Sequence, residues 1–472
     1  MTAVAAGAPA TLPPLGAGRR PEALMLALGL LVDLAAYVAV GVGHDKSFPP
    51  SIGWYAGGFA ALYLAAHLAV RRLAPYADPL LLPLVAFLNG LGLVLIHRLD
   101  LADEDRARQL NRVAPHGDAH VQFIWMLLGM VLFVAVLAVV RDHRTLQRYT
   151  YTAAAVGVAL LLVPAVLPAR YSEVNGAKIW VRAAGFSFQP SEVAKIALIV
   201  FFAGYFVAKR DVLSLASRRF FGLNLPRGRD LGPVVVAWAL MLAVVVFERD
   251  LGTALLFFGI FTAMLYVATE RTSWLVIGVA LFAAGSYAAE RLFAHVRERV
   301  DIWLHPWSQA QGHSYQLVQG LFGLGTGGVL GTGLGLGRPD LVPFAKTDFI
   351  TATLGEELGL AGLMAVLIVY GLVVQRGLRT AVLVRDTFGK LLVTGLAFSF
   401  ALQVFVVVGG VTRLIPLTGM TMPFLSYGGS SLVANWVIIG LLARVSDAAR
   451  RPVPQAAVRA PAPDETPTQV IA

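Results

Sequence analysis

The chain contains no cysteine among its 472 residues. This absence excludes disulfide bonds, cysteine-ligated zinc, iron–sulfur clusters and a thiol nucleophile. Charged residues are scarce as well, at 14% against about 25% in a typical soluble domain. Because 57% of the residues are hydrophobic and the mean hydropathy is +0.71, most of the molecular surface must face something other than water. The composition therefore predicts an integral membrane protein.

The few charges have a positive excess, with 38 Lys and Arg against 28 Asp and Glu and a net charge of +10. In a membrane protein such an excess is typical of cytoplasmic loops, and it does not require a nucleic-acid-binding face. We therefore expect no nucleic acid among the partners.

Twelve apolar runs are long enough to cross a bilayer as helices, which takes roughly 20 residues each. They lie near residues 22–42, 52–70, 78–97, 121–140, 149–168, 190–208, 231–247, 250–268, 273–290, 352–375, 388–412 and 424–443. The expected fold is an all-α, polytopic bundle of about twelve transmembrane helices with a large loop before the tenth. The first run is too long for a cleaved signal peptide. Residues 1–20 and 447–472, rich in Ala, Pro and Thr, are expected to be disordered tails that flank a membrane domain at 21–446.

The distribution of positive charge predicts the orientation in the membrane. With the N-terminus in the cytoplasm, 22 of the 38 Lys and Arg fall on the cytoplasmic side, 15 fall outside, and Lys195 lies within a span. The positive-inside rule therefore favours cytoplasmic placement of both termini. Two outer segments, 169–189 and 291–351, are too long to be simple connections. Any chemistry is expected there, on the extracytoplasmic side.

Charged residues lie at or near the start of two apolar runs, those at 190–208 and 250–268. Glu192 and Lys195 lie one turn apart on one helix face, which fits a structural ion pair at a helix start. It fits equally a functional site, because intramembrane charges are costly and face the bundle interior. Asp250 precedes another run and is expected to cap that helix, with a polar site at the mouth of the bundle as the alternative.

The end of the second long segment carries the strongest candidate for chemistry, in Thr347-Asp348-Phe349-Ile350. The spacing of Thr353 and Glu356 predicts a capping box, which explains Glu356 structurally. Asp348 has no comparable structural explanation and lies in an apolar, glycine-rich setting. We therefore expect it to serve as a general base.

Two glycine-rich stretches have less specific interpretations. Gly323-x-Gly325-x-x-Gly328 matches the dinucleotide fingerprint literally, but that fingerprint requires a strand before it and a helix after it. We expect a loop with close backbone packing or approach to a ligand instead. Residues 416–431, dense in Gly, Ser and Pro, favour either close helix packing or a broken helix that lines a cavity.

Together these motifs resemble the SEDS family of bacterial shape and division proteins. The residues within them are more similar to RodA-like than to FtsW-like members. The resemblance runs from about Gly176 to Ser446. It rests on FQPSE-x-AK at 188–195, DLGT at 250–253, the loop from 312 to TDFI at 347–350, EE-x-G at 356–359, and PLTG…PF-x-SYGGSS at 416–431. The first two runs look like an extension added to the ten-span arrangement common in this family.

The resemblance implies a peptidoglycan glycosyltransferase that polymerises lipid II at the outer face of the bacterial cytoplasmic membrane. It implies a class B penicillin-binding protein transpeptidase as partner, within an elongation or division complex. Asp348 matches the family's essential carboxylate, and Trp180 matches a functionally important tryptophan. Glu192 and Lys195 match a pair that is associated with activity and with activation by the partner.

The implied reaction requires a base for the acceptor hydroxyl and positive charge for the departing undecaprenyl pyrophosphate. The candidate cations on the outer side are Lys178, Arg299, Lys346 and Arg413. No cofactor is certain, and a divalent cation is the alternative source of charge. The other residues expected to bind substrate are Asp250, Gln316, Glu357 and Ser430. The chain departs from the family pattern at Glu248-Arg249, usually Gln-Pro, and at Ile179, usually Arg, which leaves open the cation next to Trp180.

Three rival functions fit the sequence less well. In a lipid II flippase the Glu192–Lys195 pair would line a path for the headgroup. A secondary transporter would show paired half-repeats and polar residues at the midplane, whereas the polar motifs here crowd at the outer face. A scaffold without activity leaves the organised outer segments unexplained. The polymerase is the favoured function.

Overall fold

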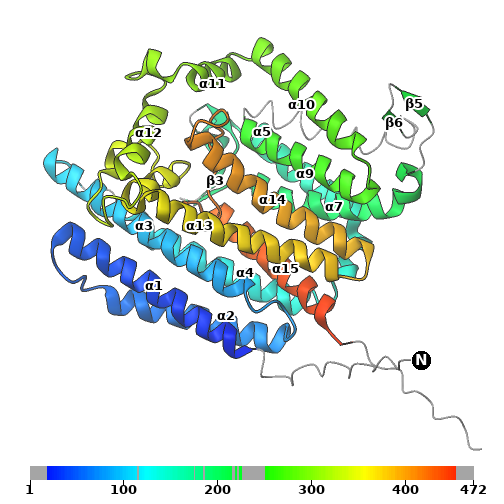
Figure 1. Ribbon diagram of the computed structural model, residues 1–472, viewed down its shortest axis with the longest axis horizontal. Helices are drawn as coiled ribbons and strands as arrows, with labels where there is room; N and C mark the ends of the chain where they lie inside the picture. Colours follow the sequence, from blue (N-terminus) through cyan, green and yellow to red (C-terminus); the bar gives the residue numbers. More distant parts are fainter. Residues whose placement is uncertain are drawn as a thin grey trace, which may run out of the picture.

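The computed structural model describes residues 19–113, 116–174, 176–183, 186–214, 218–220, 223–225 and 250–452. Within these residues, eleven helices are long and apolar enough to cross a membrane. They form one elongated bundle (Figure 1), which confirms the expected polytopic all-α fold. The predicted span at 231–247 lies outside the described residues, as do residues 1–18 and 453–472 of the predicted tails.

Each of the eleven helices overlaps one predicted run. They are α1 (Arg20–Asp45), α2 (Ile52–Leu73), α3 (Leu81–Gln109), α4 (Asp118–Val139), α5 (Thr150–Val166, after the 3₁₀ helix η2, His143–Tyr149), α7 (Pro190–Ser214), α9 (Leu251–Thr269), α10 (Ser273–Leu292), α13 (Ile350–Leu383), α14 (Thr387–Val411) and α15 (Gly429–Arg450).

The last helix differs from its prediction at both ends. α15 begins at Gly429, not at 424, because residues 424–428 form an irregular segment. It continues to Arg450, past the expected tail boundary at 447. Asp447 explains this extension, because its buried carboxylate accepts the Tyr76 amide at 2.8 Å and pairs with Arg451 at 2.7 Å.

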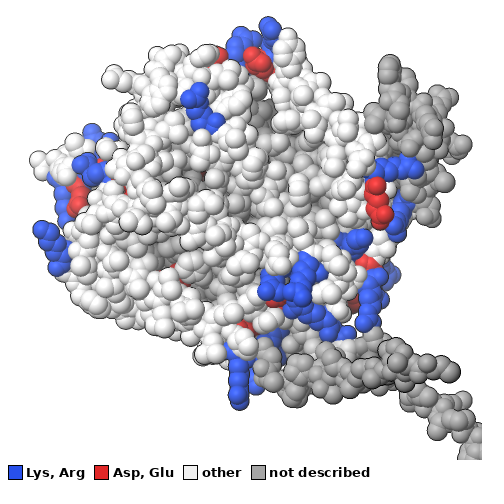
Figure 2. Space-filling model, in the orientation of Figure 1, with Lys and Arg blue, Asp and Glu red and all other residues white. Residues whose placement is uncertain are grey.

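The helices α3, α7, α14 and α15 form the buried centre of the bundle. α1 and α2 pack on the α3–α4 side, while α10 packs on α9 at the opposite edge (Figure 1). The surface between the two ends is mostly uncharged in Figure 2, and it exposes side chains such as Leu28 and Leu31. Such a band is the surface expected of a protein that contacts lipid.

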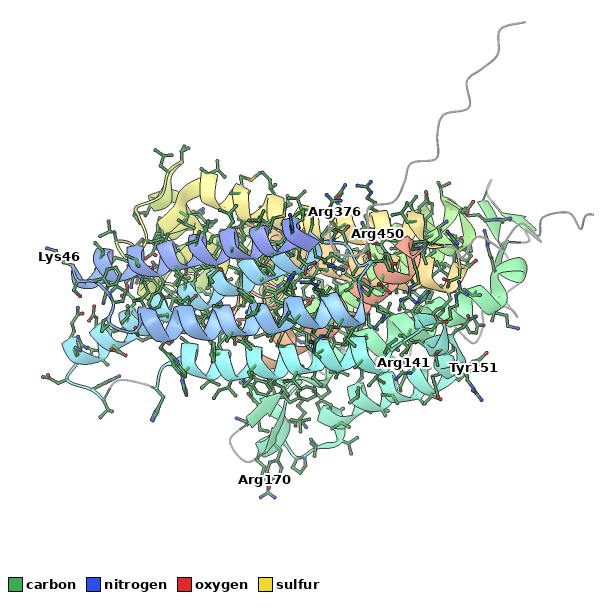
Figure 3. The ribbon with its side chains drawn as sticks, turned by 90° about the horizontal axis from the view of Figure 1, so that it is seen from below. Lys46, Arg141, Tyr151, Arg170, Arg376 and Arg450 are labelled. Carbon is green, nitrogen blue, oxygen red and sulfur yellow. The ribbon has the colours of Figure 1, made fainter. Side chains whose placement is uncertain are left out.

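The two ends of the bundle differ. One end, here called the loop end, carries residues 293–349, with α11 (Ala294–Leu304), η3 (Pro306–Gln309), α12 (Tyr315–Gly327) and η4 (Pro339–Leu341). The other, here called the terminal end, holds the start of α1 and the end of α15, because Arg19 donates to the Ala77 carbonyl and the neighbouring Asp78 amide donates to Ser446. Figure 3 shows Lys46 at the extreme of the loop end and Arg450 far from it, toward the terminal end.

The segment between α5 and α7 also has structure of its own. It contains α6 (Ala169–Ser172) and two antiparallel hairpins, β1–β2 (Glu173–Val174, Ala177–Lys178) and β3–β4 (Val181–Ala183, Phe186–Phe188). Their registers pair Glu173 with Lys178 and Arg182 with Ser187. A third hairpin, β5–β6 (Arg218–Phe220, Leu223–Leu225), follows α7.

Two local predictions require correction. α13 begins at Ile350, so Thr353 lies inside the helix, and its buried hydroxyl has no hydrogen-bond partner in the described structure. The predicted capping box is therefore wrong, and Glu356 accepts the Arg338 amide at 2.6 Å instead. Residues 323 and 325 of the fingerprint lie within helix α12, not in a loop. A Cβ at Gly327 would overlap the Gly355 carbonyl oxygen, so this stretch serves close helix packing.

Candidate functional site

A cavity of about 520 Å³ lies between the two hairpins, the starts of α7, α9 and α15, and the loop-end segments around α11, α12 and residues 344–348. It brings together residues that are far apart in the sequence. Seven of the predicted site residues line it, namely Trp180, Glu192, Asp250, Arg299, Gln316, Asp348 and Ser430.

Asp348 is held by hydrogen bonds at the wall of this cavity. The Gln316 amide on α12 donates to Oδ2 at 3.3 Å, and the Thr347 hydroxyl donates to Oδ1 at 3.1 Å. Burial raises the pKa of Asp348 above its ordinary value, while these two hydrogen bonds and the charge of Arg299 oppose the rise. Because a raised pKa makes the ionised carboxylate a stronger base, the environment suits a general base.

Asp250 caps a helix and also lies in the polar cavity, the two alternatives that its sequence position offered. Its carboxylate caps α9, since Oδ1 accepts the Thr253 amide at 2.9 Å and Oδ2 accepts the Thr253 hydroxyl at 2.5 Å. The same carboxylate lines the cavity. Burial raises the pKa of Asp250, and the nearby charge of Glu192 raises it further, against the effects of Thr253 and Arg299. The cap and the polar site are therefore one feature.

Arg299 is the one cationic side chain among the described residues that line the cavity. It projects from α11, and its Nη1 donates to the Leu417 carbonyl at 2.8 Å. Its charge lowers the pKa values of both Asp348 and Asp250. The guanidinium therefore shares the cavity with the two carboxylates and can meet an anionic group bound there.

The Glu192–Lys195 pair combines the two interpretations that its sequence left open. Glu192 lines the cavity, and Lys195 lies behind it with Nζ at 2.8 Å from Glu192 Oε2. Lys195 also donates to Gln403 Oε1 at 2.9 Å, and Gln403 Nε2 donates to the Thr421 carbonyl at 3.0 Å. This chain of polar contacts ties α7 to α14 and to the irregular segment that follows it.

The other predicted cations lie outside the cavity lining. Lys346 forms ion pairs with Asp100 at 2.7 Å, Asp103 at 2.7 Å and Asp118 at 2.9 Å. Hydrogen bonds to these carboxylates hold the pKa of Lys346 above its ordinary value, although burial opposes the rise. Lys346 is thus ion-paired within the fold and absent from the cavity lining, so its expected contact with the substrate stays a prediction that this geometry does not favour.

Arg413 and Lys178 are placed at the edge of the site. Arg413 donates to the carbonyl oxygens of Trp303 at 2.8 Å and Leu304 at 3.0 Å, so it fastens α11 to the end of α14. Lys178 lies on β2 opposite Glu173, whereas its neighbour Ile179 lines the cavity. Neither cation is among the residues that form the cavity wall.

Glu357 has a structural role. Its carboxylate is fully buried, pairs with Arg98 Nε at 2.8 Å and accepts the Gly335 amide at 3.1 Å. It therefore fastens the glycine-rich loop to α13 at a place outside the cavity lining. The expected contact of Glu357 with substrate stays a prediction, and its structural ion pair with Arg98 does not favour it.

Ser430 and Trp125 shape the cavity wall at the start of α15. The hydroxyl of Ser430 accepts the Gln189 amide at 2.8 Å, which joins α15 to the segment before α7. A Cβ at Gly429 would overlap the ring of Trp125 from α4, so glycine is required there. Trp125 was not predicted, because it lies outside the motif-bearing part of the sequence. Gln403 was also missed, although an amide within an apolar run is a usable signal.

The cavity as a whole combines three carboxylates, one guanidinium and several aromatic side chains. Glu192, Asp250 and Asp348 supply the acidic groups, and Trp125 and Trp180 supply flat apolar surfaces. This arrangement can remove a proton from a bound hydroxyl, and Arg299 can stabilise negative charge that develops nearby.

Comparison with known proteins agrees with this geometry. The sequence model of the FtsW/RodA/SpoVE family, described as cell cycle protein, matches residues 79–451. The chain is 51% identical over 444 residues to the peptidoglycan glycosyltransferase RodA of Mycobacterium tuberculosis, with 94% of each chain covered. It is 34% identical over 327 residues to a probable peptidoglycan glycosyltransferase FtsW of Geobacter metallireducens, with 69% of this chain and 84% of that protein covered.

Solved structures share the fold. One is a chain from the work "Structural coordination of polymerization and crosslinking by a peptidoglycan synthase complex", which is 26% identical to this chain with a TM-score of 0.60. The superposition covers 80% of this chain and 99% of that chain. Another is the rod shape determining protein RodA of Thermus thermophilus, which is 24% identical to this chain with a TM-score of 0.55. Here the superposition covers 80% of this chain and 98% of that chain. Because the family match spans most of the sequence, the chain belongs to the FtsW/RodA/SpoVE family of cell cycle proteins.

Proposed function

We propose that the protein is a peptidoglycan glycosyltransferase that polymerises lipid II into glycan strands. The observation that carries the proposal is the half-buried carboxylate of Asp348, held by hydrogen bonds at the wall of a cavity that Arg299 also lines. The names of the relatives, from RodA of Mycobacterium to FtsW of Geobacter, support the same activity.

The proposed step is a single displacement at the anomeric carbon of the donor sugar. Asp348 accepts the proton of the acceptor hydroxyl while the hydroxyl oxygen forms the new glycosidic bond. The bond between the anomeric carbon and the pyrophosphate oxygen breaks, and undecaprenyl pyrophosphate leaves with the bonding electrons. Arg299 lies across the same cavity and offsets the charge on the departing group.

A divalent cation fits this cavity as an ion shared with the substrate. Among the described residues, no three His, Asp or Glu side chains converge on one metal position. Mg²⁺ is commonly held by one or two carboxylates together with substrate phosphates, and Asp250 and Glu192 offer such carboxylates. Bound there, the ion would neutralise pyrophosphate charge.

We further propose that the loop end faces outward from the bacterial cytoplasmic membrane and that both termini are cytoplasmic. The excess of Lys and Arg predicted for the terminal end supports this orientation. Lipid II is then taken from the outer leaflet, in the service of cell elongation or division. A class B penicillin-binding protein is the proposed partner, and the synthase complex among the structural relatives supports it.

The experiment that tests the function is gel-resolved polymerisation of labelled lipid II by the purified protein with its cognate penicillin-binding protein. The transpeptidase serine of the partner is blocked, so that uncross-linked glycan accumulates as a ladder. A ladder that requires this protein supports the polymerase. If no ladder forms and lipid II instead crosses protein-containing liposomes, the flippase replaces it.

A further inference from the structure

The proposed reaction makes no use of the N-terminal helix pair, α1 and α2. The family match begins at residue 79, after both helices. The mycobacterial relatives share at least part of the pair, because an alignment over 94% of this chain cannot leave out residues 1–78. The pair is therefore an addition to the common family arrangement, and it requires its own explanation.

The N-terminal helix pair is fixed to α3 by buried polar contacts. The hydroxyl of Tyr55 donates to the Gly90 carbonyl at 2.9 Å, and that of Tyr63 donates to the Ala86 carbonyl at 2.5 Å. The buried side chain of Asp33 on α1 packs against Gly90, where a Cβ would overlap its carboxyl group. In a membrane such hydrogen bonds and close approaches hold helices together, so the pair and α3 form one unit.

The loop end of α1 contacts the glycine loop, residues 328–337, backbone against backbone (Figure 1). A Cβ at Gly43 would overlap the carbonyl oxygen of Leu334. From the other side, a Cβ at Gly335 would lie 2.7 Å from the Val40 oxygen and 3.0 Å from the His44 nitrogen. The contact is therefore formed by glycine on both sides and leaves no room for a side chain.

The opposite side of the glycine loop is bonded to α13 and α3. The Gly335 amide donates to Glu357 Oε2 at 3.1 Å, and Arg98 Nη2 donates to the Gly337 carbonyl at 2.9 Å. The loop is thus clamped between α1 and the early turns of α13. Since α13 begins at Ile350, two residues after Asp348, the bonded residue Glu357 lies within about two helical turns of the start of that helix.

We infer that the N-terminal helix pair positions Asp348 by holding the glycine loop against α13, with Gly43 as the positioning residue at the contact. This inference rests on the proposed function, because the position of Asp348 matters to the reaction described above. A methyl group at Gly43 must push the loop away by roughly 1 Å, and displacements of that size in a reacting geometry cost up to about 10²-fold in rate.

The test compares Gly43→Ala with Gly57→Ala. Gly57 lies on α2, and a Cβ there meets no heavy atom within 4 Å. Alanine is favoured over glycine within a helix, so neither substitution should unfold its helix. In Gly43→Ala we expect kcat for lipid II polymerisation to fall about 10- to 100-fold while KM stays within about twofold. Gly57→Ala should behave as the wild type and melt no lower, whereas the backbone overlap at Gly43 should lower the melting temperature of Gly43→Ala without unfolding the bundle at assay temperature.

Hydrogen–deuterium exchange provides a readout that does not depend on activity. In Gly43→Ala the backbone amides of residues 328–349 should exchange faster than in the wild type, while those of α14 should exchange at the wild-type rate. In Gly57→Ala both segments should exchange at the wild-type rate. Gly335→Ala approaches the same contact from the loop side and also strains a backbone at φ 84°, so as the second variant it should lose at least as much kcat. If the wild type forms no glycan, the proposed function fails, while the exchange data still report on the contact. Unchanged exchange in 328–349, or faster exchange with undiminished kcat, would overturn the inference.

Discussion

The hydrogen bond between Gln316 and Asp348 should set the acid limit of activity. Gln316 donates to Asp348 Oδ2 at 3.3 Å and thereby opposes the rise of the Asp348 pKa that burial causes. Gln316→Leu removes this donor without adding a charge. A hydrogen bond to a charged group contributes about 1.5–3 kcal/mol. The long donor–acceptor distance argues for the lower value, which corresponds to roughly one pKa unit.

The sign of the effect follows from the role of the carboxylate. A general base is active when ionised, so activity is lost as the pH falls through its pKa. Because Gln316→Leu raises that pKa, the acid limb of the kcat/KM profile should move about one unit toward higher pH. At a pH below both limbs the variant should be roughly tenfold slower, and well above both it should approach the wild type.

Initial rates of lipid II polymerisation, measured across the pH range for the wild type and Gln316→Leu, provide the assay. Thr347→Val is the matched variant, because it removes the other donor, which lies at 3.1 Å from Asp348 Oδ1. Its acid limb should move in the same direction. Limbs that stay in place in both variants would refute the assignment of the acid limit to Asp348.

Three further predictions concern residues around the site and at the terminal end. Lys346→Ala removes the cation shared by three carboxylates and should lower stability by about 2 kcal/mol, seen as a lower melting temperature with unchanged KM for lipid II. Although burial opposes it, the hydrogen bond with His143 lowers the pKa of Asp386 to about 2. The stability advantage over Asp386→Asn should therefore be complete at neutral pH and disappear as the pH falls from about 4 to about 2 in thermal unfolding. Lys195→Met leaves buried Glu192 without its cation and should lower the melting temperature, whereas adding Glu192→Gln should restore stability but not polymerisation.

The architecture was predictable because it depends on local composition. Runs of about 20 apolar residues mark spanning helices regardless of what they pack against. The irregular segment before Gly429 was predicted less well. Its conformation is set by contacts from elsewhere, such as the ring of Trp125 against Gly429.

The site was predictable only in part, because ion pairs between distant residues are invisible in a sequence. Lys346 and Glu357 were expected to bind substrate, but their partners Asp100 and Arg98 lie 246 and 259 positions away. Asp348 could be identified because its surroundings offered no structural use for a carboxylate. Arg299 could be separated from the other candidate cations only when the fold showed which of them faces the cavity.

The central claim, that Asp348 is the base of a lipid II polymerase, is tested most directly by Asp348→Asn. Asparagine keeps the size of the side chain and can still accept the hydrogen bond from Gln316, but it cannot take up the proton. We expect folded Asp348→Asn to lose glycan synthesis by about 10²- to 10⁴-fold. Asp250→Asn, at the other carboxylate with a raised pKa in the cavity, should lose less. Polymerisation by Asp348→Asn at a rate near that of the wild type would contradict the account.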